Sequence, residues 1–296
     1  MRITHRAVTQ TALLGLNSNL SSVSKLQQQL TSGKLISAPS DSPTGTNKAL
    51  QIRQDQSAVE QFAKNISDGQ SWLDSTDTAL TTVIGQVQRV RALTVQAINT
   101  GSASTSSQQA IAVEVAALRE SLLGVANSSI NDRALFGGVT QGSTAYDTDG
   151  TYVGAPPVGE GITRRVSNAD RIRIDVTGPE AFGTPGPDDL FALVGRIAAD
   201  VEGNPSALSG DLAQLDVALD RLLGAAASVG ARSARMGAAG QINTDLQLTL
   251  ASQLVDVEDI DLARTIMELN QTEVGYKAAL QATAQVIQPS LVDFLR

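Results

Sequence analysis

The stretch "VEQFAKNISDGQSWLDSTDTALTTVIGQVQRVRALTVQA", residues 59–97, carries the clearest pattern in this chain of 296 residues. Twelve positions follow an alternating spacing of three and four, and nine of them are apolar. They are Val59, Phe62, Ile66, Gly69, Leu73, Thr76, Leu80, Val83, Val87, Val90, Thr94 and Ala97. This spacing is typical of a helix buried along one seam. We expect a helix from about 46 to 99, roughly 80 Å long, which needs partner helices along its whole length.

Both ends of the chain carry a similar seam. The N-terminal seam comprises Leu13, Leu16, Leu20, Val23, Gln27 and Leu30. The C-terminal seam comprises Leu262, Ile266, Leu269, Glu273, Tyr276, Leu280, Thr283, Ile287, Leu291 and Phe294, next to Leu295. We expect the two terminal helices to pack on each other. A pair of helices leaves its outer faces uncovered, so further copies of the chain would complete the burial.

Turn-forming residues separate each terminal seam from the middle of the chain. The segment "SAPSDSPTGT", residues 37–46, predicts a turn followed by a helix start, and Pro39, Ser40, Asp41 and Pro43 form the predicted hinge. Before the C-terminal seam, "DVEDIDLA" concentrates carboxylates that complement the positive end of a helix.

The middle of the chain is mostly helical. A third helix ending near Asn127 follows the second after a short connection, so the two should be antiparallel. A later short helix is capped by Asp188 or Asp189. A long helical pattern then runs from Leu208 to Met236 and continues to Leu254 with a shift of phase.

Between these helices, residues 139–187 are rich in Gly, Pro, Asp and Thr. Within them, "GITRRVS" and "RIRIDVTG" alternate apolar and polar residues around "NAD", which predicts two strands joined by a turn. Few large apolar residues occur here, so we expect the insert to contribute little to the core.

Together these patterns predict a mainly α protein, a long coiled-coil or bundle rod built from both chain ends, with a small β-rich inserted domain. The expected divisions are a terminal-helix domain (1–45 plus 255–296), a helical rod domain (46–138 plus 183–254) and an inserted outer domain (139–182).

Composition excludes several functions. The formal net charge is −8 and no run of Lys or Arg occurs, so we expect no nucleic-acid partner. The sequence contains no run of ~18 apolar residues, so we expect no membrane span. Its first residues lack the apolar core of a signal peptide. Without cysteine, and with His5 as the single histidine, we expect no metal site, cofactor or catalysis. The sequence "DTDG" at 147–150 lacks the remaining ligands of a calcium loop and favours a turn.

Six motifs are distinctive: "MRIT" at the start, "LTSGKLISAPSDSPTGTNKALQIR" (30–53), "SWLDSTDTAL" (71–80), "NDRALFGG" (131–138), "DLARTIMEL" (261–269) and "SLVDFLR" (290–296). In this order, they resemble the flagellin superfamily. The resemblance covers both helical ends, about two thirds of the chain. Within the superfamily, the ending and "APSDSP" are similar to the junction proteins between hook and filament. Those commonly have two consecutive Asp where this chain has Asp41 and Ser42.

The resemblance implies a structural protein without catalysis, whose terminal helices line the inside of a tube while the insert projects outward. Its implied partners are like subunits in a ring, the hook-side junction protein, flagellin and an export chaperone. It also implies extracellular placement in the flagellum after type III export, without a cleaved signal peptide. Two alternatives remain: a short flagellin that forms the filament itself, and a non-flagellar helical rod with a binding insert.

Overall fold

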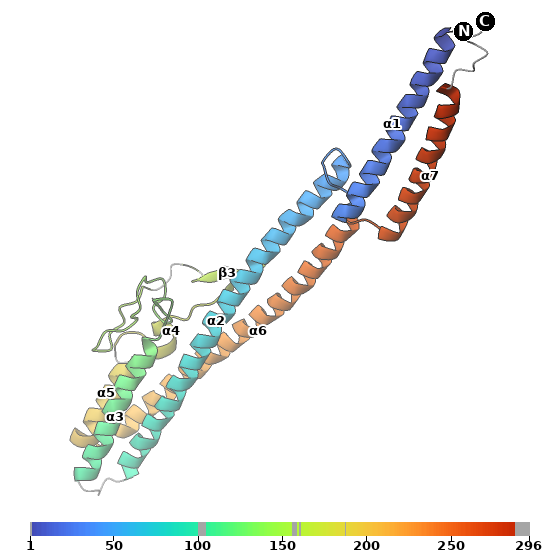
Figure 1. Ribbon diagram of the computed structural model, residues 1–296. Helices are drawn as coiled ribbons and strands as arrows, with labels where there is room; N and C mark the ends of the chain where they lie inside the picture. The colour runs from blue at the N-terminus through green and yellow to red at the C-terminus, as the bar shows by residue number, and fades with distance from the viewer. Residues whose placement is uncertain (1, 100–104, 156–158, 160, 187, 288–296) are drawn as a thin grey trace. The chain divides into compact units, whose positions relative to one another are not determined.

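A computed structural model describes residues 2–99, 105–155, 159, 161–186 and 188–287 (Figure 1). The helices are α1 (Arg2–Ser32), α2 (Pro43–Asn99), α3 (Thr105–Ala126), α4 (Gly178–Phe182), α5 (Leu190–Gly203), α6 (Leu208–Glu258) and α7 (Leu262–Ile287). The strands are β1 (Ser129–Ile130), β2 (Arg133–Ala134), β3 (Thr163–Arg165) and β4 (Arg171–Arg173). The protein is therefore mainly α with a small β region, as predicted.

The chain forms two compact units. The terminal unit comprises Met1–Ala58 and Gln247–Arg296, and the central unit comprises Val59–Leu246. Both α2 and α6 contribute residues to each unit. The finer division into three domains stays a prediction.

In the central unit, α2 lies antiparallel to both α3 and α6. Its contacts with α3 join Gln86 to Ser121 (2.8 Å) and Arg89 to Glu114 (2.6 Å). Residue numbers rise along α2 where they fall along α3, so the two helices run in opposite directions. Along α6 the contacts run in the order Arg91 to Asp216, Gln70 to Ser233 and Val59 to Asn243. The predicted antiparallel pairing of the second and third helices is confirmed.

The predicted seam of α2 is confirmed at every position, since all twelve residues are buried. Its two threonines are satisfied locally: the hydroxyls of Thr76 and Thr94 donate to the carbonyls four residues earlier, at 2.9 and 2.8 Å. Gly69 permits a close approach, because a Cβ there would lie 2.6 Å from Met236 Cε on α6. The seam therefore tolerates polar and small members where local bonding or tight packing requires them.

The predicted phase shift in α6 is wrong. Burial continues after Met236 at Asn243 and Leu250, in steps of seven, while Leu246 is 43% exposed. Asn243 holds its buried place because its Nδ2 donates to the carbonyl of Val59 at 3.1 Å. A polar residue with a satisfied bond can occupy a seam position that an apolar pattern overlooks.

The predicted hairpin in the insert is confirmed. β3 and β4 pair antiparallel, with Arg164 opposite Ile172 and Arg165 opposite Arg171. A second, shorter hairpin, β1–β2, was not predicted from the sequence. Its turn residues Asn131 and Asp132 have φ of 50° and 60°, a left-handed conformation that Asn and Asp tolerate better than other residues.

The expectation that the insert contributes little to the core is wrong. Ile172, Ile174 and Phe182 are at most 1% exposed and belong to the main core with the helices. The Phe182 ring centroid lies 4.9 Å from that of Phe136 and 5.4 Å from that of Phe191 on α5. The insert has few large apolar side chains, but those it has point inward onto the bundle.

Buried polar contacts also fasten the insert. The Asp175 side chain is fully buried, and its Oδ1 accepts from Arg173 Nε (2.9 Å) and from the amide of Ile162 (2.8 Å). From α6, Arg232 donates to the carbonyl of Asp175 at 2.7 Å.

At the start of α5, Asp189 accepts from the amide of Phe191 at 2.7 Å, which decides between the two predicted caps.

Candidate functional site

The terminal unit contains the candidate assembly site. Helices α1 and α7 lie side by side and antiparallel (Figure 1). Of the predicted seam positions, Val23 is buried and Leu16, Leu30, Leu269 and Tyr276 are half-buried. These residues form the interface of the helix pair.

Among the remaining predicted positions whose side chains are described, Glu273 and Thr283 are half-buried, whereas Gln27 and all the apolar ones are exposed. Leu13 and Leu20 on α1 are 52% and 47% exposed. On α7, Leu262, Ile266 and Leu280 are 58%, 43% and 42% exposed. These five residues are called the lateral apolar face below.

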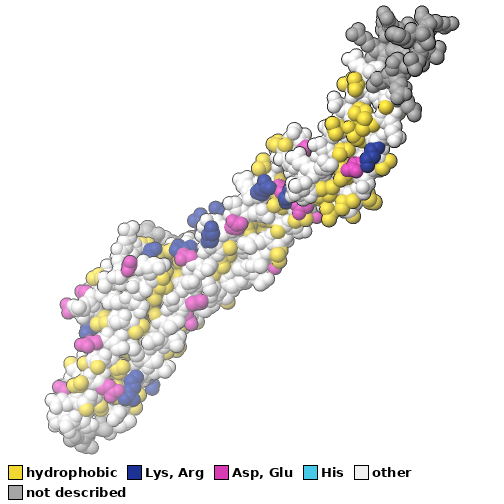
Figure 2. Space-filling view, in the orientation of Figure 1, with side chains coloured by type: hydrophobic (Ala, Val, Ile, Leu, Met, Phe, Trp, Pro, Cys, Tyr) yellow, Lys and Arg dark blue, Asp and Glu magenta, His cyan; other side chains and the backbone are white. Residues whose placement is uncertain are grey.

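Helix geometry places the exposed apolar residues of α1 and those of α7 on the same side of the pair. Successive residues turn by about 100°, so Leu13 and Leu20 point roughly 70–90° to one side of the interface direction of α1. On α7, Leu262, Ile266 and Leu280 are turned by a similar angle in the same rotational sense. Because the helices are antiparallel, rotation in the same sense places the exposed apolar residues of both helices on the same side of the pair. Figure 2 shows apolar side chains gathered over this helix pair.

The opposite side of the pair is polar. It carries Ser22 on α1 and the ion pair between Arg264 and Glu268 (2.9 Å) on α7, all exposed. The terminal unit as a whole contains nine Lys and Arg and nine Asp and Glu, so its formal net charge is zero. Close packing of several such pairs therefore meets no net charge repulsion.

The predicted hinge residues form the entry to α2. The Ser42 hydroxyl accepts from the amide of Gly45 at 3.1 Å, which makes Ser42 the N-cap, and Pro43 occupies the first helical position. This cap explains why α2 begins three residues before the predicted start. Pro39 and Ser40 are exposed in the preceding turn.

Asp41 stabilises that turn. Its Oδ2 accepts from the amides of Ser37 and Ala38 at 3.1 and 3.0 Å, and its Oδ1 pairs with Lys25 at 3.0 Å. The bond to Lys25, followed by the two amides, lowers the pKa of Asp41 below its usual value. Asp41 and Ser42 thus divide two tasks: one holds the turn and the other caps the helix.

The two connectors of the terminal unit are joined to each other, which the sequence analysis did not predict. Buried Glu258 accepts from Arg53 at 2.8 Å, and Lys34 pairs with the neighbouring Asp259. The hydrogen bond between Lys34 and Asp259 is the main cause that raises the pKa of Lys34 above its usual value. The amide of Leu35 also donates to the carbonyl of Glu258 at 2.6 Å.

The expected capping by carboxylates before α7 is confirmed for Asp261, which accepts from the amide of Arg264 at 3.1 Å. The side chain of Ile287, and all of Leu291, Phe294 and Leu295, lie outside the described residues. Their predicted role in assembly stays a prediction.

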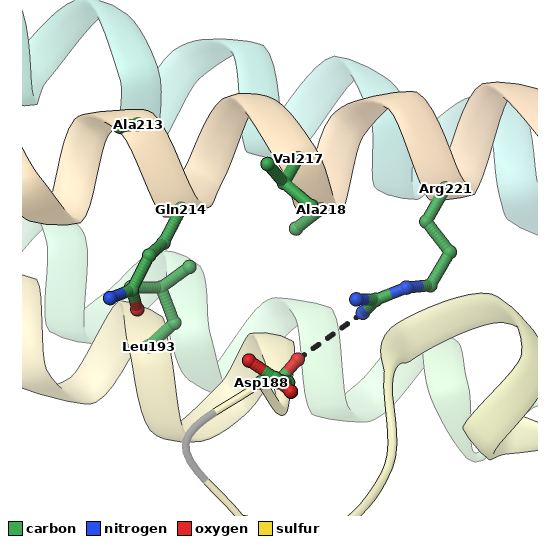
Figure 3. A pocket seen from close by; sticks show the side chains of 7 residues that line it. All are labelled: Asp188, Leu193, Ala213, Gln214, Val217, Ala218 and Arg221. Carbon is green, nitrogen blue, oxygen red and sulfur yellow. Dashed lines mark hydrogen bonds between the residues drawn. The ribbon is translucent and has the colours of Figure 1, made fainter.

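A pocket of about 270 Å³ opens in the central unit (Figure 3). Leu193 and Ala218 form its apolar wall, Gln214 lies at one end, and Asp188 and Arg221 lie at the other. Arg221 Nη1 donates to the Asp188 carbonyl at 3.2 Å. Its lining residues include no Ser, Thr, Cys or His that could act as a nucleophile or base.

In the described residues, no group of three or more His, Cys, Asp and Glu is placed to hold a metal ion. The Asp147 carboxylate at "DTDG" accepts from the amides of Asp149 (3.1 Å) and Thr151 (2.7 Å), which is a turn. Within the same residues, no helix has both the length and the apolar character to cross a membrane.

Comparison with known proteins finds a family whose sequence pattern matches the first part of the chain. Residues 3–141 match the family described as the bacterial flagellin N-terminal helical region. The resemblance to the flagellin superfamily is therefore confirmed.

Similarity to individual members extends beyond that region. The chain is 26% identical to a flagellin of Bacillus subtilis, with 97% of each chain covered. It is 24% identical to flagellar hook-associated protein 3 of Salmonella typhimurium, covering 96% of this chain and 95% of the relative. Among solved structures, FlgL of Bacillus cereus gives a TM-score of 0.60 at 22% identity, covering 69% of this chain and 99% of that one. The flagellar junction protein FlgL of Legionella pneumophila gives 0.57 at 16% identity, covering 71% and 99%.

Proposed function

We propose that the protein is a structural component of the bacterial flagellum that joins hook to filament by self-assembly through its terminal helices. The lateral apolar face of α1 and α7 carries this proposal. It places five large apolar side chains, each 42–58% exposed, on one side of a pair of helices that is polar on the other side. A surface of this kind favours burial against another molecule.

Burial of this face favours association. Complete burial of a large apolar side chain contributes ~1.5–3 kcal/mol, and each of the five retains about half of its exposure. Covering them would therefore contribute roughly 4–7 kcal/mol per copy before the cost of association is subtracted. Repetition around a ring multiplies this contribution, since each copy presents the same face.

The proposed partners are those that the resemblance to the flagellin superfamily implies. We infer a ring of like subunits, with a hook-side junction protein on one side and flagellin on the other. An export chaperone would hold the C-terminal helix before type III export, which requires no cleaved signal peptide. The mature protein would then act outside the cell, without catalysis.

Within that assembly the terminal helices would line the tube, the helical rod would surround them and the insert would face outward. The proposed boundaries remain 1–45 plus 255–296 for the first part, 46–138 plus 183–254 for the second, and 139–182 for the third. Neutrality of the terminal unit favours an inner position, where many copies lie close together.

A second candidate is a short flagellin that polymerises into the filament, which the similarity to the Bacillus subtilis flagellin favours. Deletion of the gene distinguishes the two. A junction protein predicts intact hooks, no filaments and intact flagellin released into the medium. A flagellin predicts that the filament protein itself disappears, so a deletion strain that releases no unpolymerised flagellin would contradict the junction assignment.

The role of the lateral apolar face is tested with Leu20→Asp combined with Leu280→Asp. We expect the purified variant to keep its helical circular-dichroism signal and to be secreted, but not to enter the flagellum. Ser22→Asp, on the polar side of the same helix, is the matched control and should assemble. Phe294→Asp with Leu295→Asp tests the tail in the same assay. Normal filaments in the first variant would exclude this face from assembly.

A further inference from the structure

The central unit presents an unusual electrostatic problem for an assembly of like subunits. It contains thirteen Lys and Arg against twenty-one Asp and Glu, so the entire formal net charge of −8 resides there. Copies packed around a ring would repel one another through this unit unless some surface offers complementary charge.

The outward face of the β3–β4 hairpin is such a surface. Arg165 and Arg171 stand directly opposite each other across the ladder, and both are exposed. Like charges in this position destabilise a two-stranded sheet. The neighbouring position Ile172 is 1% exposed, so the hairpin turns Ile172 inward and Arg165 and Arg171 outward.

No carboxylate in the described residues neutralises these two arginines. Arg165 Nε and Nη2 donate to the carbonyls of Ser167 (3.0 Å) and Asn168 (3.1 Å), which carry no charge. Arg171 forms no ion pair with any described residue, in contrast to Arg164, which pairs with Asp68 at 2.6 Å.

Two helices extend the positive surface. Lys64 on α2 is exposed beside Asn65, whose Nδ2 donates to the carbonyl of Arg165 at 2.9 Å. On α6, Arg235 is 61% exposed in its side chain and reaches Asp170 only at 3.4 Å. Figure 2 shows Lys and Arg side chains gathered beside β3, as located in Figure 1. Lys64, Arg165, Arg171 and Arg235 are called the basic hairpin surface.

Acidic counterparts are available elsewhere on the same unit. Asp77, Glu120 and Glu202 are exposed, and none forms an ion pair with another described residue. They lie on α2, α3 and α5, the helices of the bundle.

We propose that the basic hairpin surface binds exposed carboxylates on the helices of the central unit in a neighbouring copy of this chain, with Asp77, Glu120 and Glu202 as the candidates. The proposal rests on the self-assembly proposed above and adds a second contact, distinct from the lateral apolar face. It assigns the insert a function: its arginines offset the mutual repulsion of the central units and fix the relative position of adjacent copies. The contact should weaken with rising salt, because its charges are exposed.

The partner is identified by zero-length cross-linking in the assembled state. Arg171→Lys keeps the charge and introduces an amine that carbodiimide joins to a carboxylate in contact with it. Flagella purified from cells producing a mixture of isotopically light and heavy protein would be cross-linked and digested. We expect mixed light–heavy peptides joining position 171 to a carboxylate on α2, α3 or α5. Links confined to one copy, or to a different protein, would overturn the proposal.

Function is tested by Arg171→Glu, with Arg91→Glu as the control. Arg91 is an exposed cation of the same unit, on α2 outside the surface, its ion pair with Asp216 is exposed, and the change in net charge is the same. We expect the first variant to be secreted normally, and its incorporation to fall about tenfold at low salt relative to the control. Equal incorporation of the two variants would refute the contact. The cross-link is read in whatever polymer the chain forms, so an error in the junction assignment would leave that result intact.

Discussion

The substitution Phe182→Ala tests whether the insert is part of the core. Phe182 is 1% exposed, and its ring packs between those of Phe136, Tyr146 and Phe191, with centroids 4.9, 5.8 and 5.4 Å away. A fully buried Phe→Ala change costs about 3–5 kcal/mol, through lost apolar burial and the cavity left behind. The Tyr146 hydroxyl is buried without a hydrogen-bond partner among the described residues, so water entering the cavity can satisfy it. We therefore expect a loss near ~3 kcal/mol.

For a folding unit the size of 59–246, each kcal/mol shifts the melting temperature by about 2–4 °C, so the expected decrease is roughly 6–12 °C. A circular-dichroism melt of the full chain measures it. Val153→Ala is the control, since Val153 also lies in the insert but is 51% exposed, and it should change stability by less than ~0.5 kcal/mol. If the two variants melt together, the insert is not part of the core and replacement by a linker would be harmless.

Three further changes test the terminal unit and the contact between α5 and α6. Ser42→Ala removes the cap of α2 and should cost about 1 kcal/mol in urea unfolding, while Ser42→Asp should retain it. Glu258→Gln leaves Arg53 and Lys34 without their buried carboxylate, so trypsin should cut at these two residues several-fold faster than in the wild type. Burial and, secondly, the neighbouring Asp211 raise the pKa of Asp200 above its usual 3.8. The protonated Asp200 therefore contributes its full stabilisation below pH 3.8. This contribution is lost as the pH rises through the raised pKa. Asp200→Asn should therefore raise the melting temperature more at pH 7 than at pH 3, and an equal change at both would contradict this coupling.

The sequence by itself determined the features that depend on local repetition. The seam of α2 was fully predictable because a helix buried along its whole length repeats its apolar positions without interruption, as from Val59 to Ala97. The β3–β4 hairpin was predictable from its alternation, and the entry to α2 from the Pro and Ser residues before it. In each case the signal and the structure lie within the same short segment.

Tertiary structure decided what depends on distant residues. The terminal seams contain two sets of apolar positions, and only the placement of α7 beside α1 decides that Leu16 faces inward while Leu13 and Leu20 do not. In the sequence, Glu258 is one of several carboxylates expected to complement the start of the last helix, but contact with Arg53, 205 residues earlier, makes it a buried ion-pair partner. Phe182 likewise joined the core through rings contributed by other segments. Periodicity records how a segment presents its side chains, whereas burial depends on which surface meets it, and that surface is assembled only when the chain folds.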